Sequence, residues 1–183
     1  MFEAMRILMK TVGVLVGLAV VLALVGLVLP GHYRVERSAV ISAKPAAIFP
    51  LVGDLKAWQK WGVWFRRDPA MQLDYSPSTT QPGGWSEWKS KTQGNGRMTI
   101  SSVEPPSLFV YRLEFPDMGM VSTGTVALAP GPGGATRVTA EMDGDLGRNP
   151  VNRWFGMFMD RMIGPDFDAG LANLKQISEA PSR

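Results

Sequence analysis

The stretch SLFVYRLEF (107–115) alternates apolar and polar side chains with the two-residue period of a β-strand. Phe109, Tyr111 and Leu113 fall on one face of such a strand, whereas Arg112 falls on the other. One face should therefore be buried and the other solvated, as in an antiparallel sheet with a single covered face.

The same alternation recurs in the segments on both sides of this stretch. The residues that it predicts to point inward there are Met71, Leu73, Tyr75, Met120, Val126, Leu128, Val138, Ala140 and Met142. Glycine and proline clusters at 94–96, 105–106 and 131–134 separate the segments and are typical of hairpin turns. We therefore expect an antiparallel sheet of about six strands.

Two helical patterns accompany the predicted strands. The first begins at Pro45, which suits the first position of a helix, and should be short or bent because Pro50 lacks an amide hydrogen. The second begins with Asn149 as its cap, and its apolar residues then recur every three or four positions. Gly164-Pro165 should kink or divide this long helix without ending it. Only this element is long enough to cover the apolar face of the sheet, so the fold class is α+β.

The amino-terminal part has a different composition. No charged residue lies between Lys10 and His32, and the run is long enough to span a bilayer. We interpret residues 11–31 as a transmembrane anchor, residues 1–10 as a short tail and residues 32–183 as the folded domain. A cleaved signal peptide is the alternative, although the sequence after the run offers no small-x-small cleavage site. The weak charge bias favours a single-pass protein of the bacterial cell membrane, with its amino terminus in the cytoplasm and its domain outside.

The overall composition excludes several classes of protein. Cysteine is absent and only one histidine is present, which argues against thiol chemistry, a histidine-based triad and a metal site. The 19 Lys and Arg are scattered among 16 Asp and Glu without a basic cluster, so nucleic acid is not an expected partner. We therefore predict no catalytic constellation, no metal and no cofactor.

Three segments together resemble a known superfamily. YRVERSAVISAKPAAIFPLVGDLKAWQKWGVW (33–64) is similar to the opening of START-like proteins, the helix-grip family also called SRPBCC or polyketide cyclase/dehydrase-like. GNGRMTISSVEPPSLFVYRLEF (94–115) resembles its central hairpin, and MIGPDFDAGLANLK (162–175) resembles the end of its long helix in the membrane-anchored branch. The resemblance spans about residues 33–179. It implies a curved antiparallel sheet that wraps around a long C-terminal helix, with an apolar cavity between them.

The resemblance also implies which residues line that cavity. On this sequence they are Trp88, Phe109, Tyr111, Leu113, Met120, Trp154, Phe158 and Met162. The same residues would serve equally well as an ordinary packed core. The resemblance thus predicts a membrane-anchored domain that binds a hydrophobic small molecule or lipid.

Four further residues are expected at the cavity mouth or at a membrane surface. Arg37 shares the inward parity of its strand, and Trp64 is followed by an aromatic residue and then by Arg66 and Arg67. An aromatic side chain next to basic ones suits the boundary between lipid and water. The neighbouring Trp58 and Trp61 are expected to close the core instead.

Two other functions remain open from the sequence. The first is a cyclase- or dehydratase-like enzyme in which Tyr111, alone or with Arg37, polarises an apolar carbonyl substrate. The second is a scaffold that has a filled core and acts through its surface. An internal pocket of about 300 Å³ or more would favour the binding domain or the enzyme over the scaffold.

Overall fold

The computed structural model describes residues 2–180 of the chain. By their internal contacts these residues form two compact units, which are described separately. The first unit contains the residues up to Tyr33 together with Asp145–Phe158, and the second contains Arg34–Gly144 together with the residues from Met159 onward.

The first unit consists mainly of two helices, α1 (Phe2–Val28) and α4 (Pro150–Gly156). Within α1, Met5–Val28 has a mean hydropathy of 2.8, and it is the one helix among residues 2–180 that is long and apolar enough to cross a membrane. The helix already begins at Phe2, so the described part of the expected tail is helical. As predicted, Asn149 caps α4, because its side-chain oxygen accepts a hydrogen bond from the Val151 amide at 2.9 Å.

The second unit is built on a sheet in the order β1-β7-β6-β5-β4-β3-β2, and all pairings from β2 to β7 are antiparallel. Only the terminal residues of β1 and β7 group with the first unit. The sheet has seven strands, one more than the sequence indicated. The strands are β1 (His32–Ile41), β2 (Gln72–Tyr75), β3 (Trp85–Lys89), β4 (Gly96–Glu104), β5 (Leu108–Phe115), β6 (Met120–Pro130) and β7 (Thr136–Asp145).

Burial along the strands follows the predicted alternation. On β5, Phe109, Tyr111 and Leu113 are buried while Arg112 is exposed. The inward residues of the longer neighbouring strands are buried as well, namely Val126, Leu128, Val138, Ala140 and Met142. Burial is partial at the short edge strand β2 and at Met120, the first residue of β6. One face of the sheet therefore carries the core.

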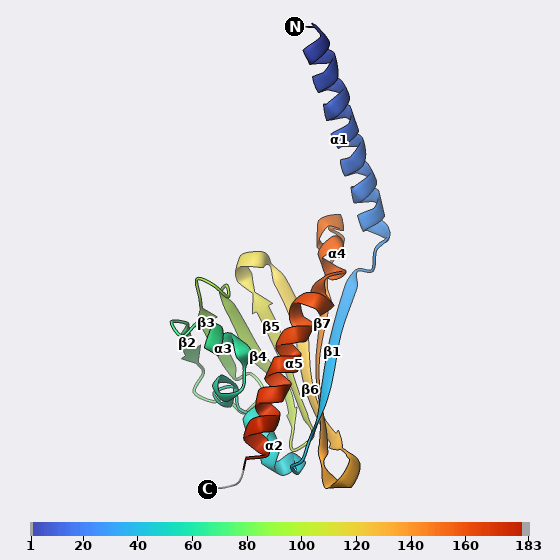
Figure 1. Cartoon of the computed structure of the whole chain (residues 1–183). Coiled ribbons are helices and arrows are strands. Elements are labelled where there is room, and N and C mark those ends of the chain that lie inside the picture. The colour runs from blue at the N-terminus through green and yellow to red at the C-terminus, as the bar shows by residue number, and fades with distance from the viewer. Residues whose placement is uncertain (1, 181–183) are drawn as a thin grey trace. The chain divides into compact units, whose positions relative to one another are not determined.

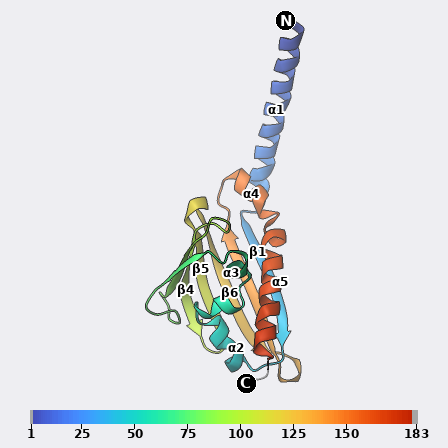
Figure 2. The ribbon, with the colours of Figure 1, turned by 60° about the vertical axis from the view of Figure 1, so that its left-hand side comes forward.

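The long helix α5 (Met159–Ser178) runs along this covered face of the sheet (Figures 1 and 2) and buries Phe167, Leu171 and Leu174. It continues through Pro165, so the prediction that Gly164-Pro165 does not end the helix is confirmed, and of the two alternatives for that point the division is excluded. The helical pattern instead breaks at residues 157–158, where amides bond three residues back in a tight turn and α4 ends.

Short helices join β1 to β2, namely α2 (Pro45–Val52), a 3₁₀ turn η1 (Ala57–Lys60) and α3 (Val63–Arg67). They place Trp58 and Trp61 in the core, where the two residues are only 3% and 6% exposed. Trp58 donates to the Val52 carbonyl at 2.7 Å and Trp61 to that of Leu51 at 2.8 Å. The predicted role of these two tryptophans in closing the core is confirmed.

Candidate functional site

The centre of the sheet's inner face is filled by aromatic side chains. The Trp58 ring lies 5.3 Å from the Tyr111 ring in an edge-to-face arrangement and 5.9 Å from the Phe109 ring. The Tyr111 ring also covers Gly124 of the paired strand, where an added Cβ would lie 2.0 Å from a ring carbon. Phe109 and Tyr111, two of the predicted cavity residues, therefore belong to a close-packed cluster.

A pocket of about 490 Å³ opens instead at the ends of strands β3 to β6. Trp88, Phe115 and Met120 contribute its apolar lining. Two hairpin loops border it and are joined to each other, because the Asn95 amide donates to the Asp117 carboxylate at 2.9 Å. Its volume lies within the range of small-molecule sites.

Strand register explains why these apolar side chains meet. Trp88 pairs with Gly96, and Phe115 pairs with Met120 at the neighbouring hairpin. The Trp88 ring stands edge-on to Phe115, with 5.8 Å between the ring centres. It occupies the place of a side chain at Gly96, where a Cβ would lie 2.2 Å from the ring. Glycine at this position lets the indole lie flat on the sheet.

Charged residues of both signs surround the apolar lining of the pocket. They are Glu87, Lys89, Arg97, Glu114 and Asp117. Arg97 lies 3.5 Å from Glu87 in a partly exposed ion pair, and its guanidinium stacks over the Trp85 ring at 4.4 Å. An apolar floor with a charged rim suits a ligand that has an apolar body and a polar end.

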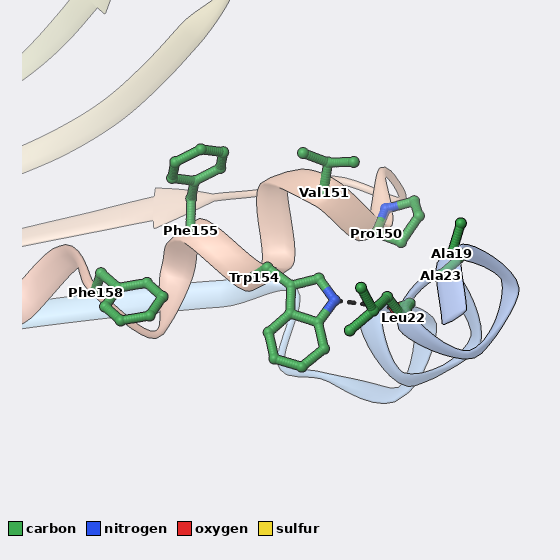
Figure 3. A pocket seen from close by; sticks show the side chains of 8 residues that line it. All are labelled: Ala19, Leu22, Ala23, Pro150, Val151, Trp154, Phe155 and Phe158. Atoms are coloured by element: carbon green, nitrogen blue, oxygen red, sulfur yellow. Dashed lines mark hydrogen bonds between the residues drawn. The ribbon is translucent and has the colours of Figure 1, made fainter. Parts of the chain in front are cut away.

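The first unit has a separate groove of about 440 Å³ between α1 and the region of α4 (Figure 3). Small and aliphatic side chains form its α1 wall, namely Ala19, Leu22 and Ala23. Larger side chains form the other wall, namely Pro150, Val151, Trp154, Phe155 and Phe158. Every lining side chain is apolar or aromatic, and the one polar group among them, the Trp154 indole N–H, donates to the Leu22 carbonyl at 2.9 Å.

Arg37 occupies the inward row of β1, as its parity predicted, and lies against α5. Its guanidinium donates to Asp160 at 2.8 and 3.0 Å and to Asp168 at 3.2 Å. These bonds raise the pKa of Arg37, and its donation to Asp160 lowers the pKa of that carboxyl. The guanidinium takes the space over Gly164, where an added Cβ would lie 2.2 Å away. Arg37 thus connects β1 to α5.

The segment of Trp64, Arg66 and Arg67 is likewise attached to α5. The Trp64 indole donates to Asp166 at 3.0 Å, and the Arg67 guanidinium forms a bidentate ion pair with the same carboxylate. That hydrogen bonding raises the pKa of Arg67. Arg66 reaches Asn173 at 3.4 Å. A role for these side chains at a cavity mouth or membrane surface stays a prediction.

The predicted cavity residues are thus distributed over different environments. Trp88 and Met120 share the pocket at the strand ends, whereas Trp154 and Phe158 line the groove of the first unit. Met162 on α5 is 62% exposed. Phe115 was missing from the predicted set although its inward parity in SLFVYRLEF could have identified it.

Residues 32–179 match the family model "Polyketide cyclase / dehydrase and lipid transport". The chain therefore belongs to this family, and the resemblance to START-like proteins with a helix-grip fold is confirmed. No curated protein is similar enough in sequence to match this chain.

Several solved structures share the fold. Truncated norcoclaurine synthase from Thalictrum flavum superposes with a TM-score of 0.62 and 9% identity, over 82% of this chain and 96% of that one. A solution structure from Thermobifida fusca gives a TM-score of 0.62 at 18% identity, over 82% and 97%. DynU16, from the dynemicin biosynthetic locus, gives 0.57 at 16%, and the match covers 80% of this chain but 47% of DynU16. At these identities the likeness establishes the fold.

Proposed function

We propose that this protein is a membrane-anchored binding domain for a hydrophobic small molecule or lipid. The observation that carries the proposal is the pocket of about 490 Å³ whose apolar lining includes Trp88, Phe115 and Met120. A scaffold that acts only through its surface would not require a hollow of this size between two hairpins. Membership of a family described by lipid transport supports the same class of ligand.

The anchor in this proposal is α1. Its side chains are exposed along almost the whole helix, and only 6% of its most apolar window is buried within the protein. An exposed apolar surface of this extent is unfavourable in water and favourable in a bilayer. Anchoring would hold the binding domain close to a reservoir of apolar ligands.

Binding is favoured over catalysis by the position of Tyr111, on which the enzyme alternative depends. Its side chain is 3% exposed and lies in the aromatic cluster with Trp58 and Phe109. A general acid must come within hydrogen-bonding distance of its substrate, and this cluster leaves little space for one. The pocket lining supplies apolar contact, which is sufficient for binding.

Native mass spectrometry of the full-length protein, released from detergent after incubation with a long-chain fatty acid, tests the proposal. Met120→Glu places a carboxylate in the apolar lining and should lower the amount of adduct below that of the unsubstituted protein, because desolvating a charge there is unfavourable. Met118→Glu is the matched control, since Met118 is 59% exposed in the turn just before β6 and does not line the pocket. An adduct that survives Met120→Glu at the level of Met118→Glu would contradict the proposed site.

A further inference from the structure

The strongest unexplained feature of the molecule is the groove between α1 and α4. On α4 and just after it, Val151, Phe155 and Phe158 are 57%, 59% and 50% exposed, although they are large and apolar. Seen from close by, Val151 and Phe155 project from one side of α4, while Trp154 is directed toward α1 (Figure 3). A surface of this kind indicates a partner that is itself apolar.

Specific contacts fix α4 against α1. Gly26 permits close approach to Pro150, because a Cβ at this position would lie 2.7 Å from the proline Cβ. The absence of a side chain at Gly26 also leaves the Leu22 carbonyl, one turn earlier, accessible to the Trp154 indole. This hydrogen bond and the glycine contact make the groove a defined feature of the first unit.

Arg153 completes the attachment at the end of α1. Its guanidinium donates to the carbonyls of Leu27 at 2.7 Å and Leu29 at 3.1 Å, and also to that of Gly147 at 2.9 Å. The last carbonyls of a helix have no intrahelical donor, and a cation is favourable beside them. An arginine at this position suits the headgroup level of a bilayer, where long basic side chains reach water.

The α1 wall of the groove indicates the depth at which an occupant would lie. Ala19 and Ala23 stand nine and five positions before Val28, the last residue of α1. At a rise of about 1.5 Å per residue they lie roughly 7 to 14 Å from the end of the helix. In a bilayer with a hydrocarbon core of about 30 Å this depth falls within the acyl chains of one leaflet.

From these observations we infer that α4 lies in the bilayer beside α1 and that a lipid acyl chain fills the groove between them. The inference rests on the proposed role of α1 as a membrane anchor. Leu22, Trp154 and Phe155 supply apolar walls, and the one polar side-chain group among the lining residues is already paired. Water would find no hydrogen-bonding partner there, whereas an acyl chain needs none.

Single cysteines can test this because the natural chain has none. The full-length protein is labelled with an environment-sensitive fluorophore at Val151→Cys or Asn152→Cys and placed in vesicles of phosphatidylcholine that carry a mid-chain nitroxide. Both positions are exposed and adjacent, but only Val151 lines the groove. Quenching at Val151→Cys should exceed that at Asn152→Cys several-fold. Equal quenching, or stronger quenching at Asn152→Cys, would overturn the inference.

A third label at Leu18→Cys in α1 tests the membrane anchor separately from the acyl-chain groove. Leu18 is 54% exposed and lies inside the apolar span. If Leu18→Cys is strongly quenched while Val151→Cys is not, the anchor stands and the acyl-chain groove is rejected. If Leu18→Cys is not quenched, the anchor and the inference both fail. Ligand binding by the second unit is measured independently through Met120→Glu.

Discussion

The two units use the same apolar residue types with opposite exposure. In the first unit, Val14 and Val28 are 70% and 82% exposed on α1. In the second unit, Val35 and Val138 are 1% and 0% exposed on neighbouring strands. The hydrophobic effect favours burial of all four side chains. The contrast therefore shows that the apolar side chains of the second unit pack against one another, whereas those of α1 remain uncovered.

This contrast assigns different tasks to the apolar residues of each unit. Most of those in the second unit hold the sheet against α5, and those at the strand ends near Trp88 remain partly accessible. Those of the first unit need a partner from outside, which we propose to be lipid. Substitutions of one kind made in both units should therefore have unequal effects.

Removal of a tryptophan should give the largest difference between the two units in the free energy of unfolding. Trp58→Ala deletes a buried ring that packs on Phe109 and Tyr111, and it leaves the Val52 carbonyl without its indole donor. We expect a loss of about 3–5 kcal/mol in the free energy of unfolding. Denaturant unfolding of the full-length protein in detergent measures this value.

The comparison substitution is Trp154→Ala in the first unit. This ring is only partly buried and lies at the side of an open groove, so the expected loss is clearly smaller than for Trp58→Ala. Equal losses for the two variants would contradict the distinction between a filled core and an open apolar surface.

Glycine substitutions should give an intermediate difference. Gly124→Ala inserts a methyl group into the space of the Tyr111 ring and should cost about 1–3 kcal/mol through overpacking. Gly17→Ala adds the same group to α1, where nothing lies within 4 Å, and should not lower the free energy of unfolding, because alanine favours a helix more than glycine does. Thermal unfolding of both variants in detergent would show the difference, and a harmless Gly124→Ala would argue against the packed cluster.

The smallest effect concerns a titrating carboxyl of the second unit. A hydrogen bond with Asp143 and burial raise the pKa of Glu141 from 4.5 to about 7, although the nearby Arg34 opposes the shift. The native state therefore retains a proton that the unfolded state releases. This contribution to stability is complete below pH 4.5 and is lost as the pH rises through about 7.

Glu141→Gln should remove this pH dependence. Denaturant midpoints of the full-length protein at pH 5 and pH 7.5 should differ more in the unsubstituted protein than in the variant, with lower stability at the higher pH. The pKa values of Asp68, Asp160 and Glu179 are lowered, so these groups titrate below this window and do not obscure it. An identical pH dependence in both proteins would contradict the raised pKa of Glu141 in the native state.

Much of the fold was predictable because burial in a sheet follows a simple period. The alternation in 107–115 identified the buried face of β5, and Pro45 and Asn149 identified the starts of α2 and α4. The break between α4 and α5 was not predictable, since the apolar period continues across residues 157–158 while the backbone does not. Periodicity indicates which face of a helix is apolar, but it does not indicate where one helix ends and the next begins.

The site was less predictable for a related reason. Parity identified Met120 as an inward residue, and the resemblance placed Trp88 in the cavity. Neither could show that Trp58 fills the centre of the sheet, since that contact joins residues distant in sequence. Likewise, Phe155 carries the signal of a buried helix face and is 59% exposed. Whether an apolar residue is covered depends on a tertiary partner that local sequence does not specify.

Photocrosslinking of the full-length protein in vesicles that contain a fatty acid with a diazirine tests the central claim most directly. Mass spectrometry of the crosslinked peptides should find two groups of modified residues. One should include 150–158 of the first unit, and the other should include Trp88 or 115–120 of the second unit. Crosslinks confined to the first unit would contradict the claim that this protein binds an apolar ligand between the hairpins of its second unit.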